Sequence, residues 1–250
     1  NNLKFYNIEN LEKSFIENNI TCIIHTACLY GRNNESLSEL LNANLIFGLK
    51  VLEMAKKYKI PTFFNTDTLL SKNVNNYALS KNQFYQWLKR DLSSMQIFMK
   101  IEHMYGLKDD KNKLIAWFIN ELINNASQIN LTSCEQKRDF IFVDDVVGAY
   151  LAVYKNKNSF GKFSEFDVAT GEQIKLKEFL LEIYKQCKAK FNFNTSLNFG
   201  AKQMRENEIM EIIENIEPLK NLGWKAKNNY KYNISLIIAE YFKGGGAPQK

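Results

Sequence analysis

The stretch that decides the fold is a short apolar run followed by a helix-forming segment: Pro61-Thr62-Phe63-Phe64-Asn65-Thr66-Asp67-Thr68, then Tyr77-Ala78-Leu79-Ser80-Lys81. The apolar run predicts a buried strand that leads to Thr66. A tyrosine and a lysine four positions apart lie on one face of a helix, so the Lys81 ammonium can lie beneath the Tyr77 phenol. A phenol has a pKa of about 10, and a nearby positive charge lowers it. With the Thr66 hydroxyl beside the same reacting oxygen, the stretch predicts a hydride-transfer site acting on a carbonyl or carbinol.

The composition is that of an ordinary globular chain, with 250 residues to bury a sizeable core and a charged fraction of 24%. No apolar run approaches a membrane span and the first residues do not resemble a signal peptide, so we expect a cytoplasmic protein without membrane contact. The four cysteines lack paired metal spacing, so we expect reduced, structural thiols and no metal site. The net charge of +6 comes from scattered lysines, which argues against a nucleic-acid partner.

A Thr or Ser at a strand end, followed by Tyr-x-x-Ser-Lys at the start of a helix, resembles the extended short-chain dehydrogenase/reductase family. The likeness is to its NAD-dependent epimerase/dehydratase group, which includes nucleotide-sugar epimerases, dehydratases and reductases. Taken alone, Tyr77 and Lys81 would more often belong to a solvated helix face with one half-buried aromatic residue, but further matches follow in order along most of the chain. The resemblance implies catalytic roles for Thr66, Tyr77 and Lys81, an NAD or NADP cofactor and a nucleotide-sugar substrate.

The fold that the resemblance implies is α/β, a Rossmann-like doubly wound parallel sheet with a smaller C-terminal substrate lobe. Residues 1–137 would form the dinucleotide-binding domain, residues 138–243 most of the substrate lobe, with the two interleaved, and residues 244–250 a flexible tail. The resemblance also implies a homodimer that pairs the helices expected over residues 37–59 and 77–91.

Two segments resemble cofactor-binding elements. Asn7-Ile8-Glu9-Asn10, at the end of a strand expected from Leu3 to Ile8, resembles the Asp-hydrophobic-x-Asp element beside the adenine, with Asn7 in place of Asp. His25-Thr26-Ala27-Cys28 resembles the His-x-Ala-Ala turn along the pyrophosphate and ribose. The resemblance therefore implies cofactor contacts from Asn7, Ile8, Thr26 and Ala27, in addition to Tyr77 and Lys81.

The residues around these elements carry their own expectations. Residues 20–25 form an apolar run typical of a fully buried parallel strand, and we expect His25 to be a satisfied core histidine. Residues 37–59 have apolar side chains at helical spacing and predict a long helix. Asn44, within that helix, matches a buried bridging Asn of the family pattern, and an exposed Asn is the alternative.

The substrate side is implied by three further matches. Met99 to Gly106 resembles Leu-Arg-x-x-Asn-x-Tyr-Gly, with His103 where an Asn touches the sugar, so His103 is a polar contact or a second acid/base. Arg138-Asp139-Phe140 opens a match to Arg-Asp-Phe-x-x-Val-x-Asp-Val, which assigns Arg138 to the diphosphate, and Arg205 fits the second phosphate-binding arginine. The remaining arginines, Arg32 and Arg90, match nothing, and we expect them on the surface.

The reaction type rests on Asp67 and Thr68, which the resemblance places at the substrate. A Thr-Asp-Glu triplet marks the 4,6-dehydratases, and Thr68 replaces its glutamate. The short connection from Thr66 to Tyr77 is more typical of reductases that finish deoxysugars for surface polysaccharide. We therefore predict reduction of a 4-keto deoxysugar nucleotide, with a 4-epimerase as the alternative.

The sequence contains no Gly-x-Gly-x-x-Gly or Gly-x-x-Gly-x-x-Gly turn, which in the family opens the first βαβ unit and holds the pyrophosphate. Two explanations are open: an N-terminally incomplete sequence, which we favour, or a non-catalytic ligand-binding relative. The coding sequence before Asn1 distinguishes them.

Overall fold

The computed structural model describes residues 3–91, 93–206 and 208–243. Contacts divide the chain into two compact units. Unit 1 runs to Lys100 and includes Asn156–Phe166, and unit 2 comprises Ile101–Lys155 and the chain from Asp167 onward. The predicted boundary at residue 137 concerns which residues bind cofactor and which bind substrate, and it stays a prediction. The predicted tail, residues 244–250, lies outside the described residues.

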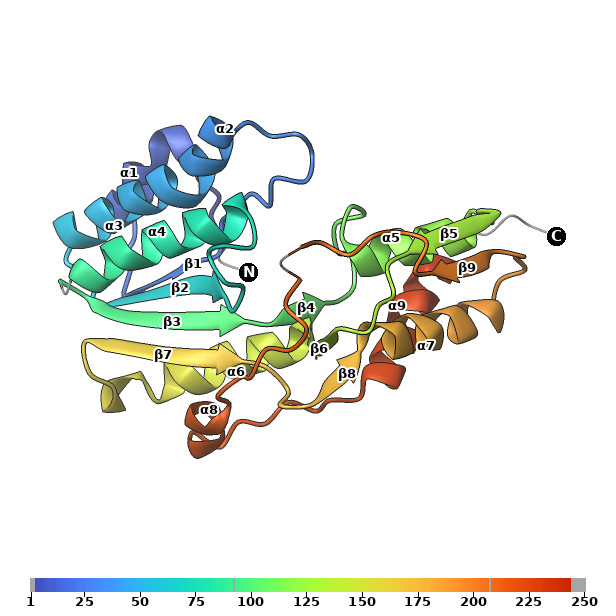
Figure 1. The fold of residues 1–250 in the computed structure, drawn as a ribbon. Coiled ribbons are helices and arrows are strands. Elements are labelled where there is room, and N and C mark those ends of the chain that lie inside the picture. The colour runs from blue at the N-terminus through green and yellow to red at the C-terminus, as the bar shows by residue number, and fades with distance from the viewer. Residues whose placement is uncertain (1–2, 92, 207, 244–250) are drawn as a thin grey trace. The chain divides into compact units, whose positions relative to one another are not determined.

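The sheet of unit 1 has the strand order β1-β2-β3-β7. Its strands are β1 (Cys22–His25), β2 (Thr62–Thr68), β3 (Met95–Ile101) and β7 (Phe163–Val168). Strands β1 and β2 are parallel, and His25 is in register with Asn65. Helices α3 and α4 lie side by side over these two strands (Figure 1). The predicted α/β class with parallel strands is confirmed.

The helical elements of unit 1 are η1 (Ile8–Asn10), α1 (Leu11–Ile16), α2 (Leu37–Leu41), the π-helical turn η2 (Asn42–Ile46), α3 (Phe47–Lys57), α4 (Asn76–Arg90) and η3 (Lys157–Ser159). The long helix predicted over residues 37–59 is thus one helical stretch interrupted by a single π turn. Ser36 and Glu39 form a capping box at its start, which satisfies two backbone N–H groups. The helices pack on the sheet through a core that includes Phe63, Phe84 and Phe98.

Two strand predictions near the N-terminus are corrected: residues 3–8 form no strand, and the strand within residues 20–25 is not fully buried. Residues 3–7 are irregular and Ile8 begins a 3-10 turn, with the Leu3 and Phe5 side chains 74% and 91% exposed. Residues 20–25 do form a strand, but only over Cys22–His25, and within it only His25 is buried while Ile24 is 52% exposed. The physical reason is the same for both. In the described part of the chain β1 lies at the edge of the sheet and pairs only with β2, so residues 3–7 have no ladder to join.

Helices α3 and α4 approach closely at Gly48. A side chain added there would lie 2.7 Å from the Phe84 ring, so the absence of a side chain lets the two helices meet. One turn earlier on each helix, Asn44 and Ser80 are joined by a hydrogen bond of 2.9 Å. The packing of the two helices thus fixes the start of α4, where Tyr77 lies.

Unit 2 contains the strand pairs and helices of the second half of the chain. Its sheets have the orders β4-β6-β8 and β5-β9, formed by β4 (His103–Tyr105), β5 (Gln128–Leu131), β6 (Lys137–Phe142), β8 (Gln173–Lys175) and β9 (Ser196–Phe199). Its helices are α5 (Leu114–Ile123), α6 (Val143–Lys155), α7 (Leu176–Lys188), α8 (Glu217–Asn221) and α9 (Tyr230–Lys243).

Helices α5, α7 and α9 gather around one core (Figure 1), in which the rings of Phe140 and Phe179 stack 3.9 Å apart. Among the described residues, no helix is long and apolar enough to cross a membrane.

Candidate active site

The start of α4 holds the two residues at the centre of the prediction. Asn75 caps the helix by accepting the Ala78 N–H at 2.8 Å, which places Tyr77 in the first turn and Lys81 one turn later. The Lys81 side chain is almost completely buried, with 2% exposed, and the Tyr77 side chain is half-buried. A buried ammonium is costly unless charges or hydrogen-bond acceptors surround it.

Asp67 supplies the charge that Lys81 faces. Burial raises the pKa of the Asp67 carboxyl while Lys81 opposes that shift, and burial lowers the pKa of the Lys81 ammonium while Asp67 and Cys28 oppose that shift. Asp67, predicted as a substrate contact, is itself 8% exposed. The opposite charges therefore stabilise each other inside the unit.

The Lys81 ammonium forms no hydrogen bond or close ion pair with any residue that the structure describes. Its three donors are thus available to a ligand, and ribose hydroxyls are acceptors of the right kind. These residues fit a nicotinamide cofactor, whose ribose Lys81 would hold and whose ring would supply or accept a hydride.

The Tyr77 phenol lies in surroundings that keep it protonated. Burial raises its pKa, with further contributions from Cys28, Tyr30 and Asp67, while Arg32 lowers it. The sequence predicted that Lys81 would bring this pKa towards neutrality, and the structure does not show that lowering, because desolvation of the phenolate is the larger effect. A protonated phenol is the form that donates a proton.

A chain of hydrogen bonds links the loop after β1 to the start of α4. The Asn44 amide is fully buried and pairs with the backbone of Leu29, accepting from its N–H at 2.7 Å and donating to its carbonyl at 2.8 Å. Asn44 also donates to Ser80 Oγ, which donates to the Tyr77 carbonyl at 2.8 Å. Of the two alternatives left open for Asn44, the buried bridging one is correct, and it lies in the π turn η2, a feature frequent at functional sites.

The other predicted residues of unit 1 lie at strand ends. Thr26 and Ala27 directly follow β1 and are exposed, as are Asn7 and Ile8. Thr66 and Thr68 are half-buried residues of β2, and the Thr68 N–H donates to Asp67 at 2.8 Å. Because the carboxyl ends of β1 and β2 are adjacent, Thr26 lies near the same end of the sheet as Thr66.

His25 is a core residue, as expected, but it is not satisfied. Its ring packs against Phe47, Phe63 and Phe84, and its Nε2 has no hydrogen-bond partner among the described residues. Both polar atoms of Asn65, the residue in register with it, are likewise buried without a partner among the described residues. Burial, assisted by the Lys81 charge, lowers the pKa of His25 from 6.5 to about 4.

This lowered pKa predicts acid sensitivity. Between pH 6.5 and about pH 4 the unfolded chain carries a proton on His25 that the folded protein lacks, so the free energy of unfolding falls as pH is lowered through that window. The contribution is roughly 3 kcal/mol in total. Urea titrations at pH 7 and pH 5 check it: His25→Leu, which cannot be protonated, should flatten the difference. An unchanged pH dependence in that variant would contradict the assignment.

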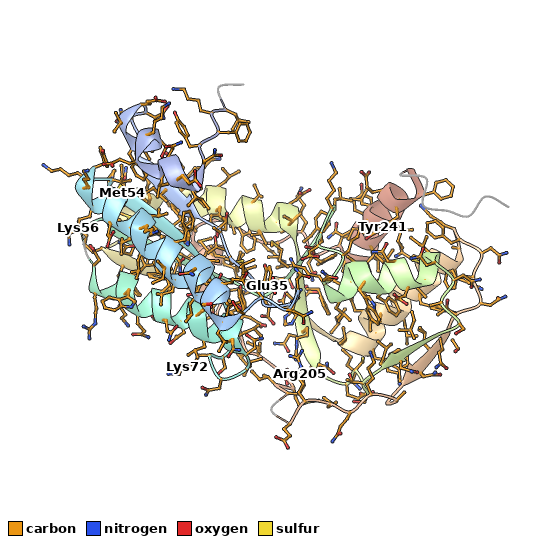
Figure 2. The ribbon with its side chains drawn as sticks, turned by 90° about the horizontal axis from the view of Figure 1, so that it is seen from above. Glu35, Met54, Lys56, Lys72, Arg205 and Tyr241 are labelled. Atoms are coloured by element: carbon orange, nitrogen blue, oxygen red, sulfur yellow. The ribbon has the colours of Figure 1, made fainter. Side chains whose placement is uncertain are left out.

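In unit 2, two of the three predicted substrate residues are paired with acidic side chains. His103 is half-buried, and its Nδ1 lies 3.0 Å from a carboxylate oxygen of buried Glu102, which fixes the orientation of the ring and leaves Nε2 for another contact. Arg138 is buried and pairs with Glu208 at 2.5 Å, whereas Arg205 is exposed on the segment between β9 and α8 (Figure 2). The backbone N–H of Glu208 donates to the carbonyl of Arg205 at 3.2 Å, so the acid that pairs with Arg138 follows Arg205 in one turn.

Several residues with a place in the site were not found from the sequence. Arg32 was expected to be an unremarkable surface residue, yet its charge acts on Tyr77, and Tyr30 packs directly on the Tyr77 ring. Glu102 and Glu208 were not predicted either.

Among the described residues there is no group of three His, Cys, Asp or Glu side chains that could hold a metal ion.

Comparison with known proteins decides the family. The model of the "NAD dependent epimerase/dehydratase family" matches residues 1–169. The chain belongs to this family. The predicted membership in the extended short-chain dehydrogenase/reductase group is confirmed, and NAD in the family's description confirms the predicted class of cofactor.

The chain is similar to named sugar-nucleotide enzymes. CDP-abequose synthase of Salmonella typhimurium is 37% identical over 93% of this chain and 80% of its own length. The dTDP-4-dehydro-6-deoxyglucose reductase of Escherichia coli is 24% identical over 87% of this chain and 65% of its own length. The crystal structure of Thermus thermophilus UDP-glucose 4-epimerase with NAD has a TM-score of 0.76 at 18% identity, covering 96% and 83% of the two chains, which shows a shared fold.

Proposed function

We propose that this protein is an NAD(P)-dependent reductase of a 4-keto deoxysugar nucleotide. The observation that carries the proposal is the buried Lys81 ammonium, which has no hydrogen-bond partner among the described residues, one helical turn from the protonated Tyr77 phenol. The printed names of two relatives support the substrate class. One is a synthase of a CDP-linked sugar and the other reduces a 4-dehydro-6-deoxy sugar nucleotide, so a CDP-linked 4-ketosugar is the first substrate to test.

A reduced nicotinamide cofactor, when bound, would supply the hydride that the carbonyl carbon accepts. Tyr77 donates its phenolic proton to the carbonyl oxygen, and Thr66 donates a hydrogen bond to the same oxygen. Lys81 would donate to the ribose hydroxyls of the cofactor. Solvent then returns a proton to Tyr77, which balances the reduction of the ketone to an alcohol.

The remaining assignments follow the fold. Asn7, Ile8, Thr26 and Ala27 would contact the cofactor from the loops that flank β1, where their exposure suits a ligand contact. The burial of Asp67 beside Lys81 supports a role in holding that ammonium as well as one at the substrate.

On the substrate side we assign Thr68, His103, Arg138 and Arg205. An anionic diphosphate would compete with Glu208 for the Arg138 guanidinium, while Arg205 is exposed. Calorimetric titration of CDP into Arg138→Ala and Arg205→Ala tests these two residues. Affinity equal to wild type in both variants would remove them from the site.

The reaction type has a direct test. Protein expressed from its complete reading frame is supplied with a CDP-linked 4-keto-6-deoxysugar and with cofactor deuterated at its transferable position. We expect deuterium at C4 of the product, with a matching loss of absorbance from the reduced cofactor, because a reductase consumes one hydride per turnover. Interconversion of two sugars without label or absorbance change would show an epimerase, and tight binding of the sugar nucleotide without turnover would show a non-catalytic relative.

The assembly and location of the protein complete the proposal. We assign a homodimer to the outer face of α3 and α4, where Trp87 is 54% exposed and Lys56 projects from the helix (Figure 2). A groove on this face is lined by Leu49, Leu52, Glu53, Lys56, Trp87, Arg90, Asp91 and Ser93. Sedimentation of the purified protein tests the dimer, and a monomer at all concentrations would contradict it.

A cytoplasmic location follows from the proposed use of a nicotinamide cofactor, and fractionation of cells checks it.

A further inference from the structure

The loop after β1 is held in a fixed shape against α4. Leu29 is tied through its backbone N–H and carbonyl to the buried Asn44 amide. Two residues later Gly31 has a φ of +70°, a conformation that a residue with a side chain adopts only under strain. A side chain at Gly31 would also lie 3.3 Å from Leu40. The chain therefore turns back at Gly31, and Tyr30 lies between two constrained neighbours.

Three side chains contact one another in succession, Arg32 on Tyr30 and Tyr30 on Tyr77, and we call this series the column. The ring of Tyr30 lies against the ring of Tyr77 with centroids 4.8 Å apart and an angle of 37° between the planes. On Tyr30, the Arg32 guanidinium carbon lies 4.9 Å from the ring centroid. Arg32 is exposed, so its planar cation rests on the aromatic face without losing its hydration. The column thus begins in solvent and ends at the proton-donating phenol.

We propose that Arg32 is a positioning residue for Tyr77, which it serves by holding Tyr30 against the Tyr77 ring and by bringing a positive charge to the phenol. This inference rests on the proposed function only for the direction of proton transfer. Arg32 touches neither the reacting carbonyl nor the cofactor in this assignment, so its contribution is to the anion that Tyr77 becomes when its proton is given away.

The Arg32 charge matters because the other groups that face Tyr77 disfavour its phenolate form. Cys28, Tyr30 and Asp67 all disfavour the phenolate, and burial disfavours it further. Lys81, one turn along α4, has its own charge offset by Asp67. Arg32 is the cation whose effect on Tyr77 lowers the pKa of the phenol, and it arrives from a different element, the loop between β1 and α2.

The test measures turnover in both directions for Arg32→Met, Arg32→Lys and Tyr30→Leu. For Arg32→Met we expect kcat to fall by roughly three- to tenfold with KM nearly unchanged, because one partly screened charge is lost. In the alcohol-oxidation direction, where Tyr77 must first lose its proton, the rising limb of the pH profile should move to higher pH. Arg32→Lys keeps the charge but loses the planar stacking, so its kcat should lie between those of the wild type and Arg32→Met.

The matched control is Lys89→Met. Lys89 also lies over a tyrosine ring on α4, 5.8 Å from the centroid of Tyr85, but it has no contact with Tyr77. This variant should keep the wild-type pH profile. Because Arg32 is exposed, the difference between wild type and Arg32→Met should also shrink in high salt, which a purely structural effect would not do.

Two outcomes overturn the inference: an unchanged kcat and pH profile in Arg32→Met, or a raised KM at constant kcat, which would make Arg32 a substrate contact. A measurement that needs no turnover separates failure of this inference from failure of the proposed function. With ¹³C-labelled tyrosine, the ring resonance of Tyr77, identified by its absence in Tyr77→Phe, should shift in Arg32→Met and Tyr30→Leu and stay in place in Lys89→Met. A Tyr77 resonance that does not respond to Arg32 would refute the column even in an inactive protein.

Discussion

Tyr77→Phe is expected to reduce turnover by roughly two to four orders of magnitude while leaving the affinity for the sugar nucleotide little changed. The variant deletes only the proton donor, because the phenylalanine ring can keep its packing on Tyr30 at the same 4.8 Å separation. Steady-state kinetics with the deuterated cofactor measure the loss. A spectrum and thermal midpoint like those of wild type would show that the fold is intact.

The same helix provides the control for this prediction. Tyr85 lies two turns beyond Tyr77, and its hydroxyl pairs with Glu165 rather than with any group of the candidate site. Tyr85→Phe should therefore keep turnover within a few-fold of wild type. If Tyr77→Phe were as active as Tyr85→Phe, Tyr77 would have no part in proton transfer.

The second large effect is expected on stability, at Asp139 in unit 2. This fully buried carboxylate accepts four hydrogen bonds from the turn after β7: the N–H groups of Thr170, Gly171 and Glu172 at 3.0, 2.6 and 3.2 Å, and the Thr170 hydroxyl at 2.9 Å. Asp139→Ala removes the acceptor that these donors share and leaves those of buried Thr170 without it, and we expect a loss of roughly 3 to 5 kcal/mol in the free energy of unfolding.

Urea titration measures that loss, and hydrogen exchange at the amides of residues 170–172 localises it. Asp139→Asn keeps one acceptor oxygen and should lose less. Asp144→Ala is the comparison, because Asp144 is an exposed acid in the first turn of α6 and should cost at most about 1 kcal/mol. An Asp139→Ala protein no less stable than Asp144→Ala would show that the turn does not depend on the carboxylate.

Where local pattern and tertiary packing agree, the sequence predicts the structure well. The helix with Tyr77 and Lys81 on it has its own N-cap and a regular apolar face, so its bounds are close to those predicted. The long helix from residue 37 is recognisable for the same reason, although the π turn around Asn44 is not, because nothing in the residue spacing marks an extra residue in one turn.

The errors occur where a residue's surroundings come from distant segments. Leu3 and Phe5 have the composition of a strand, but a strand forms only beside another strand. Ile24 belongs to an apolar run, but β1 lies at the edge of the described sheet. The column of Arg32 on Tyr30 depends on the turn at Gly31 and on the anchoring of Leu29 by Asn44, fifteen positions away. None of these contacts between distant segments is marked by a regular spacing of residues in the sequence.

The close approach at Gly48 has a consequence for how this protein can vary. Gly48 and Phe84 form one rung of the α3–α4 interface, and Asn44 and Ser80 form the next. A single methyl group at position 48 would push the helices apart and stretch the Asn44–Ser80 hydrogen bond. Asn44 also secures Leu29, on which the position of Tyr30 depends. A change in helix packing at position 48 therefore also reaches the proposed proton donor, although it replaces no residue assigned to the substrate.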